Sequence, residues 1–139
     1  MRRFFSIIIL ALLVSATGAT GAGDLTVNVR DLESNAGQLR FALFDSADTF
    51  MKQSVRSSIV PVENSGGTWV ADDLPYGTYA LIVHHDVNGN GELEQHWYGK
   101  PKEPVGASNN PKMRFGPPRF KHARFELGSA QLTLDVVVK

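Results

Sequence analysis

The sequence contains no cysteine, and this absence excludes several classes of protein at once. Without thiols there is no disulfide framework, no thiolate metal site and no cysteine that could carry a lipid. An excess of charge of one sign is also lacking, because 14 basic residues balance 14 acidic residues. A chain with this balance is not built to bind nucleic acid.

Long hydrophobic runs are equally scarce. Residues 4–14 form an apolar run of eleven residues that only Ser6 interrupts, whereas a bilayer-spanning helix needs about 20. Two arginines precede this run and small residues follow it, which is the three-part plan of a secretory signal peptide. An uncleaved membrane anchor is the alternative, for which the run is short.

We predict that residues 1–22 are a signal peptide cleaved after Ala22, with Ala19 as the alternative position. Residues 23–139 then form one domain, long enough for a core of its own. The expected location is periplasmic or secreted, with no membrane span after cleavage.

The rest of the chain has the patterns of short strands. Residues 25–30 and 38–44 alternate apolar and polar side chains, as half-buried strands do. Pro75 and Gly77 predict a turn before a strand that runs to about His85. A hairpin is expected from residues 119–127 and 131–138. We predict an all-β fold of about seven strands, an antiparallel β-sandwich of immunoglobulin-like or prealbumin-like type. An edge-closed barrel is the alternative.

Five short segments carry a resemblance to a known family. They are residues 74–80 (LPYGTYA), 84–91 (HHDVNGNG), 99–103 (GKPKE), 108–110 (SNN) and 116–118 (GPP). In this order they resemble the bacterial exported family of the domain of unknown function 2141. The resemblance implies a small β-sandwich with a signal peptide and implies no activity. Gly106 and Ala107 stand where that family often has an aromatic residue, so a pocket filled there by the aromatic would be emptier here.

The loop that begins at Asp86 is the strongest chemical motif. Its oxygen ligands are spaced as in an EF-hand loop. The side chains of Asp86, Asn88 and Asn90 stand at positions 1, 3 and 5. The backbone carbonyl of Glu92 stands at position 7, and the Glu94 side chain stands at position 9. Trp97 stands at position 12, where a glutamate belongs. The loop therefore predicts either calcium binding with a dissociation constant of about 10⁻⁴–10⁻³ M, or a metal-free hairpin loop with Asx turns.

The histidines suggest a second type of metal site. His84 and His85 are adjacent on a strand, so we expect their side chains to face opposite sides. One of them, with His96 and His122, could bind zinc or copper. The alternative is one buried histidine bonded to the backbone and one on the surface. A metal-dependent enzyme that uses His84 or His85, His96 and Asp86 is the corresponding functional hypothesis.

Basic residues gather in one segment. Residues 100–124 contain seven basic residues and one acid, and residues 23–99 contain four basic residues and eleven acids. The loops 86–94 and 99–118 are therefore expected to form a recognition surface for an anionic envelope component or another exported protein. The alternative is that the two loops only neutralise each other. The surface residues are Trp97, Tyr98, Lys100, Lys102, Ser108, Asn109, Lys112 and Arg114.

These features favour a noncatalytic binding or envelope-accessory module whose ligand the sequence does not name. A calcium-stabilised structural module is the alternative. No catalytic residue is assigned, because the sequence has no nucleophile elbow and no phosphate-binding loop. Calcium is the one cofactor that the sequence suggests.

Overall fold

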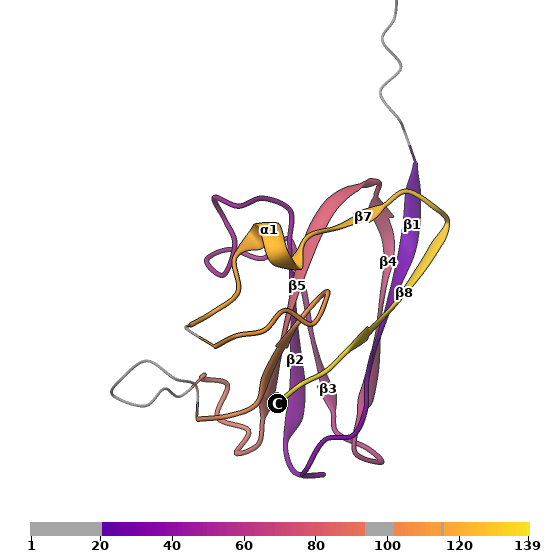
Figure 1. Ribbon diagram of the computed structural model, residues 1–139. Coiled ribbons are helices and arrows are strands. Elements are labelled where there is room, and N and C mark those ends of the chain that lie inside the picture. The colour runs from indigo at the N-terminus through magenta and orange to yellow at the C-terminus, as the bar shows by residue number, and fades with distance from the viewer. Residues whose placement is uncertain (1–20, 94–101, 115) are drawn as a thin grey trace, which may run out of the picture.

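The computed structural model describes residues 21–93, 102–114 and 116–139. Two β-sheets pack against each other, one with the strand order β4-β1-β8 and one with the order β3-β2-β5-β6 (Figure 1). A further short strand, β7, pairs with β5. The elements are β1 (Ala22–Val29), β2 (Gln38–Phe44), β3 (Arg56–Pro61), β4 (Gly67–Pro75), β5 (Gly77–Asp86), β6 (Val105–Ala107), α1 (Phe120–Ala123), β7 (Phe125–Leu127) and β8 (Gln131–Val136).

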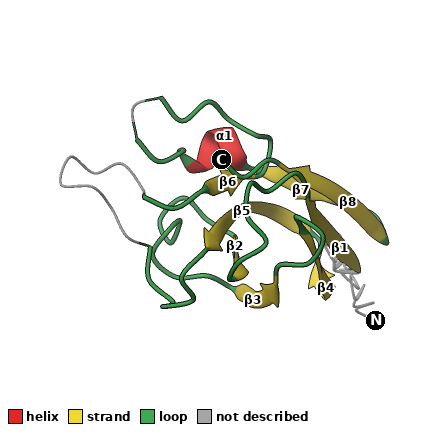
Figure 2. Ribbon diagram, turned by 90° about the horizontal axis from the view of Figure 1, so that it is seen from below, coloured by secondary structure: helices red, strands yellow, loops and turns green. Residues whose placement is uncertain are grey.

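The main core lies between the two sheets, and the end-on view of Figure 2 separates the two groups of strands. Alternate residues of β1 and β2 enter it, because successive side chains of a strand point to opposite faces. Phe41 contacts Trp69 across the sandwich, with ring centroids 5.5 Å apart. The fully buried members of these two strands include Leu25, Val27, Leu39, Phe41 and Leu43.

Strand β5 is covered on both of its faces, and its last eight residues are all buried. One face enters the main core. Part of the other face lies beneath a second apolar cluster, to which α1 contributes Ala123. The remaining members of this cluster are Phe44, Ala80, Ile82, Val105 and Ala107, with Ala42, Phe50 and Phe120 packed against them.

The turn before β5 forms at the predicted place. The Tyr79 hydroxyl donates a hydrogen bond to the Pro75 carbonyl oxygen at 2.5 Å, which ties the start of β5 to the end of β4. Gly77 is the first residue of β5. The tyrosine ring packs beside Phe125 of β7, with centroids 6.3 Å apart.

The predicted all-β sandwich is confirmed, with eight strands in place of about seven. The structure differs from the expectations in three respects. Residues 119–127 and 131–138 do not form a hairpin, because β7 pairs with β5 and β8 pairs with β1. The β1–β8 pairing is also parallel, unlike the other strand pairs described. In addition, β6 lies inside the stretch 99–118, which was expected to have no strand.

Within the described ranges, no helix combines the length and the apolar composition that a bilayer crossing requires.

Candidate metal centre

The last residues of β5 present two potential metal ligands on one face of the sheet. His84 and Asp86 are two positions apart on the strand, so both side chains point to the same side. His85 lies between them and faces the other way, where its Nε2 is 2.8 Å from the Ala36 carbonyl oxygen. The expectation that the adjacent histidines separate is therefore confirmed. Both histidines are buried, so neither is the surface residue of the metal-free interpretation.

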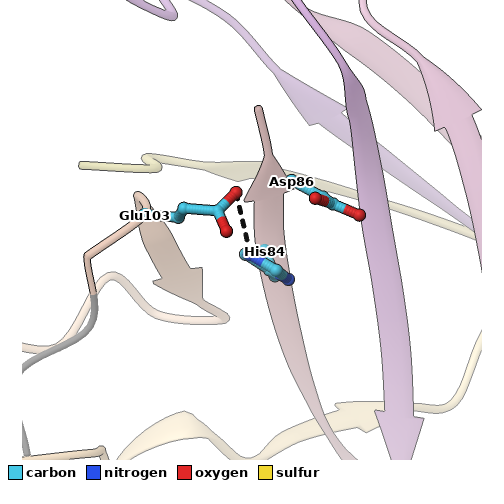
Figure 3. Close-up of side chains that lie close together, drawn as sticks. All are labelled: His84, Asp86 and Glu103. Atoms are coloured by element: carbon cyan, nitrogen blue, oxygen red, sulfur yellow. Dashed lines mark ion pairs between the residues drawn. The ribbon is translucent and has the colours of Figure 1, made fainter. Parts of the chain in front are cut away.

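A third potential ligand, Glu103, comes from the segment that leads into β6. Val105 pairs with His84 across the β5–β6 ladder, and the His85 N–H donates to the Pro104 carbonyl oxygen at 2.9 Å. These bonds hold Glu103 against the end of β5. Figure 3 shows its carboxylate directed at His84, with Glu103 Oε2 3.6 Å from His84 Nε2. The same oxygen accepts a hydrogen bond of 2.7 Å from the Val87 N–H.

One oxygen of Asp86 is fully engaged. Its Oδ2 accepts hydrogen bonds from the Gly91 N–H at 2.8 Å and from Gln38 Nε2 at 3.3 Å, and it lies 3.7 Å from Arg40 NH1. Burial alone raises the pKa of Asp86. The hydrogen bonds from Gly91 and Gln38, together with nearby His84, outweigh burial and hold this pKa below its usual range. Asp86 is therefore ionised although it is completely buried.

Three polar atoms at this place are enclosed by protein without a hydrogen bond from any described residue. They are His84 Nε2, Asp86 Oδ1 and Glu103 Oε1. Leaving a buried polar atom unsatisfied costs about 1–3 kcal/mol, so three together call for a bound partner, either ordered water or a metal ion. One ligand atom from each residue lies within 4.8 Å of the other two. We refer to His84, Asp86 and Glu103 as the carboxylate–histidine cluster.

The protonation state of His84 suits metal binding. Burial lowers the pKa of His84, and the carboxylates of Glu103 and Asp86 only partly offset this effect. The imidazole is consequently neutral near pH 7, the form in which a ring nitrogen offers a lone pair to a cation. A cation between the three side chains would also balance two adjacent buried carboxylates.

The model of a family described as "Uncharacterized protein conserved in bacteria (DUF2141)" matches residues 27–135. The chain belongs to this family. No curated protein and no solved structure matches the chain. The resemblance drawn from the sequence is thus confirmed, and the matched region of this DUF2141 member includes the whole carboxylate–histidine cluster.

The predicted calcium ligands are divided between the cluster and solvent. Asp86 is buried in the cluster, whereas Asn88, Asn90 and Glu92 are exposed on the loop. Asn88 Oδ1 accepts a hydrogen bond from the Asn90 N–H at 3.1 Å, and Asn90 Oδ1 accepts one from the Glu92 N–H at 2.9 Å. These are the Asx turns of the metal-free interpretation. Glu94 lies outside the described residues, and calcium binding by this loop stays a prediction.

The predicted recognition surface is only partly placed. Lys102, Lys112 and Arg114 are exposed. Trp97, Tyr98 and Lys100 lie outside the described residues, as does His96 of the predicted zinc or copper site. His122 is exposed on α1 and is not a member of the carboxylate–histidine cluster.

Ser108 cannot belong to a recognition surface, because it is fully buried. Its hydroxyl donates to the Ala123 carbonyl oxygen and accepts a hydrogen bond of 3.0 Å from the Leu81 N–H. Asn109 is exposed, but its side-chain amide donates to the carbonyl oxygens of His122 at 3.2 Å and Arg124 at 2.8 Å. The hydrogen bonds of both residues therefore hold α1 and the residue after it against the sheet.

Sequence reasoning missed Glu103 as a ligand. The signal that could have found it is charge, since Glu103 is the single acid among the seven basic residues of the segment 100–124. The spacing of His84 and Asp86 on a strand was a second signal, because it puts the two side chains on one face.

Proposed function

We propose that this protein is a noncatalytic metal-binding module of the bacterial cell envelope, and that it binds one divalent transition-metal ion through His84, Asp86 and Glu103. The observation that carries the proposal is the convergence of three enclosed ligand atoms that lack hydrogen-bond partners among the described residues. Buried histidine and carboxylate side chains in such an arrangement are normally satisfied by hydrogen bonds or by a metal.

The donor set favours a particular class of metal. Calcium takes six to eight oxygen ligands, and the cluster offers one imidazole nitrogen and two carboxylates. One nitrogen with two carboxylate oxygens suits zinc and other first-row divalent ions, which accept imidazole readily. The neutral imidazole and the ionised Asp86 are the protonation states that such an ion requires.

A binding role in the envelope follows from the surroundings of the cluster. Lys102 is exposed directly beside Glu103 in the sequence, and Lys112 and Arg114 are exposed further along the same segment. These cations and the loop after Asp86 supply a surface for an anionic envelope component or another exported protein. The signal-peptide pattern of residues 1–22 is the support for the location.

Zinc binding by purified protein tests this proposal. We expect one zinc ion per chain by elemental analysis after dialysis, and a measurable zinc affinity by calorimetry. The variant His84→Ala should lose affinity by about 100-fold or more, since even partners outside the ligand shell are worth about 10- to 100-fold. His122→Ala is the matched control, because His122 is exposed and outside the cluster. Equal zinc affinity in His84→Ala and the unaltered protein would contradict the proposal.

The start of the mature chain gives a second prediction. The Gly21 carbonyl oxygen accepts a hydrogen bond of 2.9 Å from the Tyr76 N–H, and Ala22 pairs with Pro75. A cut after Ala22 would remove both residues from the sheet, whereas a cut after Ala19 keeps them. This pairing favours the alternative cleavage after Ala19 over the position after Ala22 predicted from the sequence. We therefore expect the mature chain to begin at Thr20, as measured by the intact mass of the exported protein. A mature chain that begins at Gly23 would refute this expectation.

A further inference from the structure

A hollow of about 270 Å³ adjoins the carboxylate–histidine cluster on the outer face of the sheet β3-β2-β5-β6. Arg40 of β2 pairs with Ile59 of β3 on one side and with His84 of β5 on the other. These three residues form a row across the sheet. The complete lining is Arg40, Phe41, Ala42, Ser57, Ser58, Ile59, Ile82 and His84.

The hollow has a polar part and an apolar part. Arg40 supplies N–H donors and His84 an imidazole ring in the row next to the Gln38–Asp86 pair. In the next row, Ala42 pairs with Ile82 and offers apolar surface. Ile59 lies on the far side of Arg40 from His84 and adds a side chain that is 52% exposed, and Ser57 lies beside Ala42 in the second row. A ligand with an anionic group at one end and a short apolar body at the other would match this division.

Arg40 has donors to spare for such an anion. Its NH1 lies 3.7 Å from Asp86 Oδ2, and the side chain is 33% exposed. A guanidinium group carries five N–H donors in a planar fork, and it pairs with carboxylates through two parallel hydrogen bonds. Among the described residues, the guanidinium makes no ion pair besides the one with Asp86, although it lies beside Gly91. The remaining N–H donors of the fork are available to a ligand in the hollow.

His84 links the hollow to the cluster. A metal ion that binds imidazole at Nε2 leaves the ring proton on Nδ1, so the ring becomes a fixed hydrogen-bond donor. His84 belongs to the cluster through Nε2 and also lines the hollow. Metal binding would therefore prepare a second nitrogen donor beside Arg40.

We propose that this hollow binds a small organic carboxylate, with the carboxylate between Arg40 and His84 and its apolar body against Ala42, Ile59 and Ile82. The inference rests on the proposed function, because the bound metal is what fixes His84 as a donor. The volume of about 270 Å³ limits the ligand to a small molecule, since pockets for drug-sized ligands are usually about 300–1,000 Å³.

The test uses benzoate as the probe and benzamide as its neutral counterpart of the same shape. Calorimetric titration of the zinc-loaded mature protein should show benzoate binding at least about tenfold more tightly than benzamide, because hydrogen bonds to charged groups are worth that much. Removal of zinc should weaken benzoate binding. Arg40→Gln should abolish it at a zinc concentration high enough to saturate the variant, with the bound zinc measured in the same sample. Arg30→Gln is the matched control, because Arg30 is exposed and follows β1 in the other sheet.

The outcomes separate the two proposals. A protein that retains no zinc overturns the proposed function, and this inference with it. A zinc-loaded protein that does not distinguish benzoate from benzamide, or that binds benzoate equally well without zinc, overturns the inference alone. Unchanged benzoate binding in zinc-loaded Arg40→Gln does the same. Binding of inorganic phosphate without binding of benzoate would overturn the assignment to a carboxylate.

Discussion

Replacing Asp86 with alanine is expected to lower the free energy of unfolding of the metal-free protein by about 1–3 kcal/mol. The Asp86 carboxylate is fully buried and accepts hydrogen bonds from Gly91 and Gln38 beside the Arg40 guanidinium. The alanine variant leaves these donors without their acceptor, whereas the Arg40 guanidinium, whose side chain is 33% exposed, keeps contact with water. Urea unfolding followed by tryptophan fluorescence measures the loss.

A surface ion pair of the same length provides the control. Arg56 NH1 lies 3.7 Å from Asp72 Oδ1, but the Asp72 side chain is 81% exposed. Asp72→Ala should therefore change stability little, since exposed pairs contribute almost nothing. Asp86→Asn keeps an acceptor for the Gly91 N–H, so its loss in free energy of unfolding should lie between those of Asp86→Ala and Asp72→Ala. This variant preserves the test if Asp86→Ala does not fold. Equal effects of Asp86→Ala and Asp72→Ala would contradict this account.

Replacing Ser108 with alanine is expected to lower the free energy of unfolding by about 2–4 kcal/mol. The Ser108 hydroxyl joins β5 to α1, because it accepts from the Leu81 N–H and donates to the Ala123 carbonyl oxygen. Both backbone groups lose a buried partner in the variant. Urea unfolding of the two proteins at the same pH measures the difference.

The control for Ser108 is another serine with a hydrogen bond to the backbone. The Ser129 hydroxyl donates to the Gln131 carbonyl oxygen at 2.9 Å, but at an exposed position where water can replace it. Ser129→Ala should therefore have a small effect. If Ser108→Ala is as stable as Ser129→Ala, the buried hydroxyl does not hold α1 in place.

The strands that the sequence predicts well are those with one face in the core and one face in polar surroundings. Strands β1 and β2 have this alternation, and their predicted and observed limits nearly coincide. Strand β6 has only three residues, all of them buried, in a segment rich in proline and glycine. Three buried residues are too few to show an alternation of buried and exposed side chains. The position of this strand is determined by its pairing with β5.

The wrong hairpin has a different cause. Residues 125–127 and 131–136 have the composition of two strands around a glycine turn, so local reasoning pairs them with each other. Their actual partners, β5 and β1, are distant in sequence and belong to different sheets. The carboxylate–histidine cluster was not predicted because it also depends on pairing between separate segments. The β5–β6 pairing brings Glu103 close to His84.

The parallel pairing of β1 with β8 imposes an order on folding. β1 is the central strand of its sheet, and its outer neighbours are β4 and the last strand of the chain. Contacts between such distant segments carry a large entropy cost and slow the folding of a domain. The first strand cannot be enclosed on both sides until the C-terminal strand has been synthesised. Until then one edge of β1 lacks its partner, so the sheet β4-β1-β8 is completed last at the β1–β8 ladder.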